Sequence, residues 1–181
     1  SVVTGIIRQD NGYFKWFGEE PEAGQRRNIG SLIEIPHFYP YLNLERNLRI
    51  ICDIKGMPYG NIARVLDTAQ LTDRKRSRFS TLSLGMKQRL GIAASLLGDP
   101  RVLVLDEPTT GVDAVSRKEF WEMLRKLKKQ GITIVVSTPY MDEAVLCDRV
   151  ALIQKGSLLD ITDPSQAVAK GAEALYSLQS S

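Results

Sequence analysis

The sequence predicts an α/β domain with a mostly parallel sheet flanked by helices, and two apolar runs carry this prediction. Residues 102–105 form an unbroken aliphatic run that stops at Asp106-Glu107-Pro108, and residues 132–136 form a second run. Short runs without alternation are typical of strands covered on both faces, as in parallel sheets. An amphipathic helical pattern follows Asp113 and separates the two runs, as expected for a helix that packs on a sheet.

Composition limits the classes of function. The chain has 181 residues, of which 43% are hydrophobic, enough for one core, so we expect one compact domain. A net charge of +3 with dispersed basic residues argues against a nucleic-acid partner. Cys52, Cys147 and the single His37 are too scattered for a zinc site. No apolar run is long enough to span a bilayer, so any link to a membrane requires a partner.

The first half of the chain is predicted to contain short strands and a helical region. Residues 1–7 resemble the end of a helix, and residues 13–18 and 28–34 are predicted strands. Residues 43–71 have the apolar spacing of helices, and the glycines and proline of residues 56–60 break them into two.

The second half alternates helices and strands. Residues 83–97 are predicted to form a helix with Ser83 as its N-cap and Gly98-Asp99-Pro100 as its stop. The helix after Asp113 has an apolar stripe and ends before a glycine. A short helix at 144–147 and a hairpin of strands 148–153 and 157–161 follow. The apolar stripe of the helix after Asp113 consists of Phe120, Trp121, Leu124 and Leu127, and the glycine that stops this helix is Gly131. The last predicted helix covers residues 164–181.

Asp106 and Glu107 end the aliphatic run, where ligands of α/β sheets usually bind. Successive strand residues point to opposite faces, so adjacent carboxylates can serve different tasks. One can hold Mg²⁺, usually through water, and the other can orient and deprotonate an attacking water. Taken alone, the pair is equally consistent with an acidic turn after a buried strand.

Ser83 marks a second candidate site. The amino end of a helix has free N–H groups and a partial positive charge, which suit a phosphate, and Gly85 allows the backbone to approach an anion closely. For Ser83 alone, an ordinary capped helix is the better interpretation. The carboxylates that follow after one helix and its loop favour a phosphate site instead.

Three segments resemble motifs of ATP-binding cassette (ABC) proteins. Residues 82–89 are similar to the signature motif, although Leu84-Gly85-Met86 departs from its Gly-Gly-Gln pattern. Residues 102–107 resemble the Walker B strand and Gly111-Val112-Asp113 resembles the D-loop. Their order and spacing fit the family, and the similarity covers nearly the whole chain. The chain therefore resembles the ATP-binding subunits of ABC transporters, of the exporter branch.

The resemblance implies an ABC-type P-loop NTPase core with an α-helical signature subdomain at residues 39–98. The α/β core would comprise residues 1–38 and 99–163, and residues 164–181 would be a tail. ATP and Mg²⁺ would be held between two subunits paired head to tail, and their closure would drive an integral membrane permease. The chain would then lie at the cytoplasmic side of the membrane, attached through that permease.

The resemblance also implies roles for single residues. Glu107 would be the general base, Asp106 the Mg²⁺ partner and Asp113 a contact across the subunit interface, while Ser83 and Gly85 would face the nucleotide of the other subunit. The loop Tyr39-Pro40-Tyr41 is a candidate contact for the permease, and capping of the helical core is an equally favoured alternative.

The chain departs from the family at its phosphate-binding loop and at its Q-loop. It has no Gly-Lys dipeptide, so the P-loop, which needs Gly-Lys-Ser/Thr, is missing. We attribute this to truncation at the amino end, because the similarity begins in mid-helix, and expect the isolated chain to be inactive. Glu34 stands where a glutamine normally reaches toward Mg²⁺, and a carboxylate also ligates Mg²⁺. The alternative is a rim carboxylate without a metal contact.

The third departure is Pro139, which stands where the family has its switch histidine. Proline has neither a side-chain donor nor a backbone N–H, and one lost polar contact of this kind lowers rates by about 10²–10³. The main hypothesis is therefore an ATPase subunit of an exporter. The alternative is a weakly hydrolysing, degenerate ABC partner with a structural or regulatory role, and a soluble ABC protein of DNA repair or translation is less favoured.

Overall fold

The computed structural model describes residues 11–20, 28–33 and 38–165. The chain divides into two compact units, Ser1–Ser137 and Thr138–Ser181. The predicted domain organisation, with its subdomain at residues 39–98, stays a prediction. None of the helices in the described ranges has the length and hydropathy of a bilayer-spanning segment.

A three-stranded parallel sheet forms the centre of the first unit. It contains β1 (Ile29–Leu32), β2 (Val102–Asp106) and β3 (Thr133–Ser137) in the order β1-β2-β3. All pairings are parallel, and Asp106 lies opposite Ser137 in the register. The predicted parallel sheet is confirmed, and the strand that carries Asp106 is its central strand.

The two faces of this sheet differ in burial. Leu103 and Leu105 are buried, and a Cβ added to Gly30 would come within 2.6 Å of the Ser95 carbonyl oxygen at the end of α3 (Leu84–Ser95). This helix therefore packs directly on one face. Along β3, however, every second residue is exposed, and Val135 exposes 50% of its surface. The prediction of a fully buried strand at 132–136 is wrong for this part of the chain, because only one of its faces is covered.

Helices fill the segment between β1 and β2, as predicted. α1 (Leu44–Lys55) ends at Gly56, whose φ of 62° is left-handed, and a 3-10 turn (Tyr59–Asn61) leads into α2 (Ile62–Thr68). Two further 3-10 turns, Thr72–Arg74 and Phe79–Thr81, precede α3. The three helices contact one another and bury the apolar residues Leu44, Leu48, Cys52, Ile62, Val65, Leu66 and Leu90.

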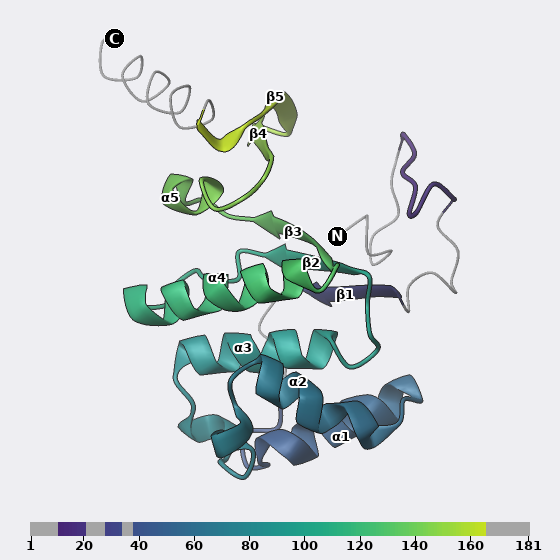
Figure 1. Ribbon diagram of the computed structural model, residues 1–181, viewed down its shortest axis with the longest axis vertical. Helices are drawn as coiled ribbons and strands as arrows, with labels where there is room; N and C mark the ends of the chain where they lie inside the picture. Colours follow the sequence, from purple (N-terminus) through teal and green to yellow (C-terminus); the bar gives the residue numbers. More distant parts are fainter. Residues whose placement is uncertain (1–10, 21–27, 34–37, 166–181) are drawn as a thin grey trace. The chain divides into compact units, whose positions relative to one another are not determined.

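Helix α4 (Ala114–Lys129) connects β2 to β3 and lies beside α3 (Figure 1). The apolar stripe predicted for this helix is buried, and the helix is followed by a glycine with a left-handed φ of 91°. The residues concerned are Phe120, Trp121, Leu124, Leu127 and Gly131.

The second unit contains the short helix α5 (Met141–Ala144) and the strands β4 (Val150–Gln154) and β5 (Ser157–Thr162). The strands pair antiparallel as the predicted hairpin. The helix ends where the predicted one, at 144–147, was to begin. Acidic residues in its first turn favour this earlier start, because they complement the helix dipole.

The predicted strand at 13–18 is not formed. Within residues 11–20, only an isolated bridge joins Trp16 to Glu19, and a strand requires a partner along its length. The predicted helix at 1–7, and residues 166–181 of the predicted tail helix, lie outside the described residues.

Candidate functional site

The predicted carboxylate pair lies at the carboxyl edge of the parallel sheet. Asp106 is the last residue of β2, Glu107 follows it, and both side chains are exposed. Because β3 runs parallel to β2, its last residue, Ser137, reaches the same edge. The sheet therefore presents two carboxylates and a hydroxyl together at the edge where ligands of such folds bind.

Ser137 forms hydrogen bonds with both residues of the pair. Its hydroxyl donates to Asp106 Oδ1 and accepts from the Glu107 N–H, with a donor–acceptor distance of 3.1 Å. Ser137 was not among the site residues predicted from the sequence. The signal was available, since the last residue of the next parallel strand is the expected neighbour of Asp106.

The backbone at Glu107 is left-handed, with a φ of 44°, which is unusual for a residue other than glycine. Two hydrogen bonds form within the turn. Thr110 Oγ1 donates to Glu107 Oε2 (3.2 Å), and the Thr110 N–H donates to the Glu107 carbonyl oxygen (3.2 Å). These bonds fix both the backbone and the carboxylate of the predicted general base.

Ser83 is the N-cap of α3, as predicted. Its Oγ accepts from the Met86 N–H (3.3 Å), and its side chain is exposed. The first turn of α3 contains no acidic residue. The partial positive charge at this end of the helix is therefore not neutralised by a carboxylate within the first turn. A second molecule can reach this helix end.

Gly85 has a packing role that the sequence did not reveal. It is buried, and an added Cβ would lie 2.6 Å from Ser116 Cβ in the first turn of α4. The segment before α4 also touches the start of α3, since a Cβ on Gly111 would lie 3.3 Å from Leu84 Cδ2. The segments resembling the signature motif and the D-loop are therefore packed together in one subunit. The predicted contact of Gly85 with a nucleotide stays a prediction.

Asp113 is the N-cap of α4. Its Oδ1 accepts from the Ser116 N–H (2.9 Å), and the hydrogen bonds from Ser116 hold the pKa of the Asp113 carboxyl below its usual value of 3.8. The lowered pKa keeps this carboxylate negatively charged at neutral pH. Because the residue is exposed, the charge is accessible.

Two predicted site residues belong to other parts of the chain. Glu34 lies outside the described residues, as does His37. Pro139 is in the second unit, where it is exposed. The neighbouring Thr138 hydroxyl donates to Glu143 Oε2 (2.6 Å) and accepts from the Tyr140 N–H (3.1 Å), so this hydroxyl is used to fold the loop.

The acidic residues at the edge of the sheet fit Mg²⁺ rather than a metal held in a protein cage. In the ranges that the structure describes, no three His, Cys, Asp or Glu residues form a metal-binding group. Mg²⁺ is usually held by one or two carboxylates, with waters and substrate phosphates as the other ligands. Asp106, with Oδ1 engaged by Ser137, would supply one such carboxylate, and its role as the Mg²⁺ partner stays a prediction.

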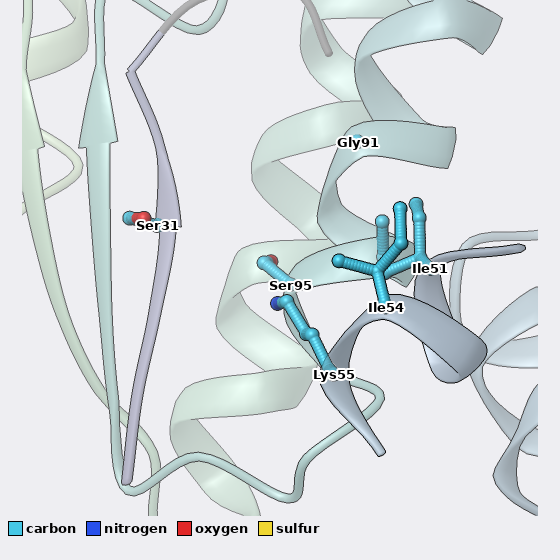
Figure 2. A pocket seen from close by; sticks show the side chains of 7 residues that line it. Ser31, Ile51, Ile54, Lys55, Gly91 and Ser95 are labelled. Atoms are coloured by element: carbon cyan, nitrogen blue, oxygen red, sulfur yellow. The ribbon is translucent and has the colours of Figure 1, made fainter. Parts of the chain in front are cut away.

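A pocket of about 260 Å³ lies between α1, α3 and β1. Figure 2 shows Ile51, Ile54 and Lys55 of α1 on one side of it and Ser95 of α3 on another. Among the residues that the structure describes, none of those predicted to bind the nucleotide lines this pocket.

A family model described as "ABC transporter" matches residues 1–110. The lantibiotic transport ATP-binding protein SrtF of Streptococcus pyogenes is 33% identical over 159 residues, which cover 87% of this chain and 69% of SrtF. An uncharacterized ABC transporter ATP-binding protein of Bacillus subtilis, YhcH, is 41% identical over 88% of this chain and 54% of its own length. The probable multidrug ABC transporter ATP-binding protein YbhF of Escherichia coli is 34% identical over 94% of this chain and 31% of its own length.

The chain thus spans about half of YhcH and a smaller share of YbhF. Among solved structures, cbiO1 from Clostridium perfringens, part of the ABC transporter complex cbiONQ, matches with a TM-score of 0.83. The match covers 93% of this chain and 72% of cbiO1 at 24% sequence identity, and it shows that the two proteins share a fold.

Proposed function

Because the chain belongs to the ABC transporter family, we propose that it is part of an ATP-binding subunit that couples ATP hydrolysis to export through a membrane permease. The observation that carries this proposal is the position of Asp106 and Glu107 at the carboxyl edge of a parallel sheet. The exposed Ser83 at the amino end of α3 is a second support, because it is open to another subunit.

The two carboxylates have different roles in this proposal. Asp106 would hold Mg²⁺ through water, and Mg²⁺ when bound neutralises charge on the phosphates. Glu107, fixed by Thr110, would orient the attacking water and accept its proton. Glu34 would add a ligand near Mg²⁺.

The nucleotide would lie between two such subunits. The start of α3, with Ser83 and Gly85, would face the phosphates of the ATP bound by the other subunit, since a helix amino end attracts anions. Asp113, whose carboxylate is exposed beside this helix start, would contact the partner subunit. The close packing of Gly85 on Ser116 supports joint movement of the two segments.

The permease would contact the loop before α1. Tyr39 and Tyr41 are 46% and 66% exposed, and their rings contact each other with centroids 5.9 Å apart. Phe38, which is buried against Phe79, covers the helical core instead. An exposed aromatic pair beside a covered core favours the contact role over the capping role for these tyrosines. The subunit would then lie at the cytoplasmic face of the membrane.

The test is steady-state ATPase activity and ATP binding of the full-length protein that carries this chain. Glu107→Gln should abolish turnover and leave ATP binding intact, because the amide keeps the shape of the side chain but accepts no proton. Glu122→Gln, an exposed residue of α4, is the matched control and should behave as the wild type. Full turnover by Glu107→Gln would contradict the assignment of the general base.

Pro139 favours a second candidate function, a nucleotide-binding partner that hydrolyses ATP slowly. The switch position offers no side-chain donor, and the Thr138 hydroxyl beside it is engaged within the loop. For such a partner, Pro139→His should raise the turnover of the full-length protein. Brisk turnover by the wild type, unchanged by Pro139→His, would exclude this candidate.

A further inference from the structure

We propose that Ser137 is a positioning residue that holds both Asp106 and Glu107 in place for Mg²⁺ binding and water activation. This inference rests on the proposed function and adds a residue to it. Ser137 touches neither the nucleotide nor the metal in this proposal, and it acts through the two carboxylate residues.

The parallel register brings Ser137 to the carboxylates. β2 and β3 pair so that Asp106 lies opposite Ser137 at the last position of both strands. Neighbouring residues of paired strands share a face, so the short serine side chain reaches the Asp106 carboxylate directly. Its hydroxyl donates to Asp106 Oδ1, a charge-assisted hydrogen bond, which is stronger than one between neutral groups.

The same serine holds the backbone of Glu107. The Glu107 N–H donates to the Ser137 carbonyl oxygen (3.0 Å) and to its Oγ (3.1 Å). A hydroxyl offers one donor and two acceptor lone pairs, so Ser137 serves both residues at once. Glu107 needs such support, because left-handed φ values are sparsely populated by residues other than glycine.

The arrangement also selects one oxygen of Asp106. Oδ1 is engaged by Ser137, whereas Oδ2 has no hydrogen-bond donor among the described residues. The serine thereby fixes the rotation of the carboxylate and leaves one oxygen for the hydrated metal. Residues that orient a metal-binding carboxylate in this way typically change metal affinity or activity about 10–100-fold when replaced.

The experiment compares Ser137→Ala with the wild type in the full-length protein. Two quantities are measured: binding of a fluorescent ATP analogue as Mg²⁺ is titrated, and the Mg²⁺ dependence of ATPase activity. For Ser137→Ala, the Mg²⁺ concentration at half-saturation should rise about 10-fold or more in both titrations, with kcat lowered about 10–100-fold. Binding of the analogue at saturating Mg²⁺ should change less than twofold.

Two further variants separate positioning from general damage to the strand. Ser137→Thr keeps the hydroxyl and should restore most of the Mg²⁺ affinity. Thr133→Val removes a hydroxyl from the same exposed face of β3, but this residue pairs with Val102 rather than with Asp106. It should leave both titrations unchanged.

The inference alone is overturned if the wild type binds and hydrolyses ATP and Ser137→Ala has the same Mg²⁺ dependence. Equal losses in Ser137→Ala and Thr133→Val, or no recovery in Ser137→Thr, would overturn it as well. A wild type that neither binds nor hydrolyses ATP would overturn the proposed function, and this inference with it.

Discussion

Replacing Gly85 by alanine tests whether direct contact holds the starts of α3 and α4 together. The new Cβ would lie 2.6 Å from Ser116 Cβ and 2.9 Å from its Oγ, whereas carbon atoms in contact are about 3.5–4.0 Å apart. Overpacking of this kind costs about 1–3 kcal/mol, of which the better helix propensity of alanine offsets roughly 0.5–1 kcal/mol. We therefore expect Gly85→Ala to lower the free energy of unfolding by about 1–2 kcal/mol.

Urea denaturation of the full-length protein measures this loss, and a double-mutant cycle assigns it. Ser116→Gly removes the colliding atoms, so the double variant should regain stability. Its loss of unfolding free energy should be smaller than the sum of the two single losses by about 1–2 kcal/mol. Gly60→Ala is the matched control, because Gly60 has no atom within 4 Å of an added Cβ and no left-handed φ. A coupling below about 0.5 kcal/mol, or an equal loss in the control, would refute the reasoning.

Two further predictions concern the first unit. Asn47→Ala should lower the free energy of unfolding by about 2–3 kcal/mol in the same assay. The reason is that Asn47 is 2% exposed and its side chain forms hydrogen bonds with both the N–H and the carbonyl oxygen of Tyr39. A loss near zero would contradict this prediction. The pKa of Asp113 is lower in the folded protein than its ordinary value of 3.8. The contribution of Asp113 to stability is therefore complete above pH 3.8 and is lost as the pH falls through the pKa of the folded state. Thermal melts of Asp113→Asn, which caps without titrating, should therefore lose less stability in acid than the wild type, and equal losses would count against this role.

Much of the candidate site could be predicted because its signals are local. Ser83 and Asp113 cap their helices as serine and aspartate commonly do, and the aliphatic run before Asp106 ends where the strand ends. Each of these depends on a few neighbouring residues. The partners of Asp106 and Gly85 could not be predicted in this way, because Ser137 and Ser116 lie 31 residues away in each case.

By itself, the sequence determined which residues end the strands, which cap the helices and which motifs the chain contains. The tertiary structure alone decided which of these residues touch. Residues 13–18 have the composition of a strand, yet they form only the isolated bridge at Trp16. Strand β3 has one face exposed although its residues 134–136 are all aliphatic. The physical reason is the same in both cases: helix caps are satisfied within one turn, whereas strand pairing and burial depend on partners that distant parts of the chain must supply.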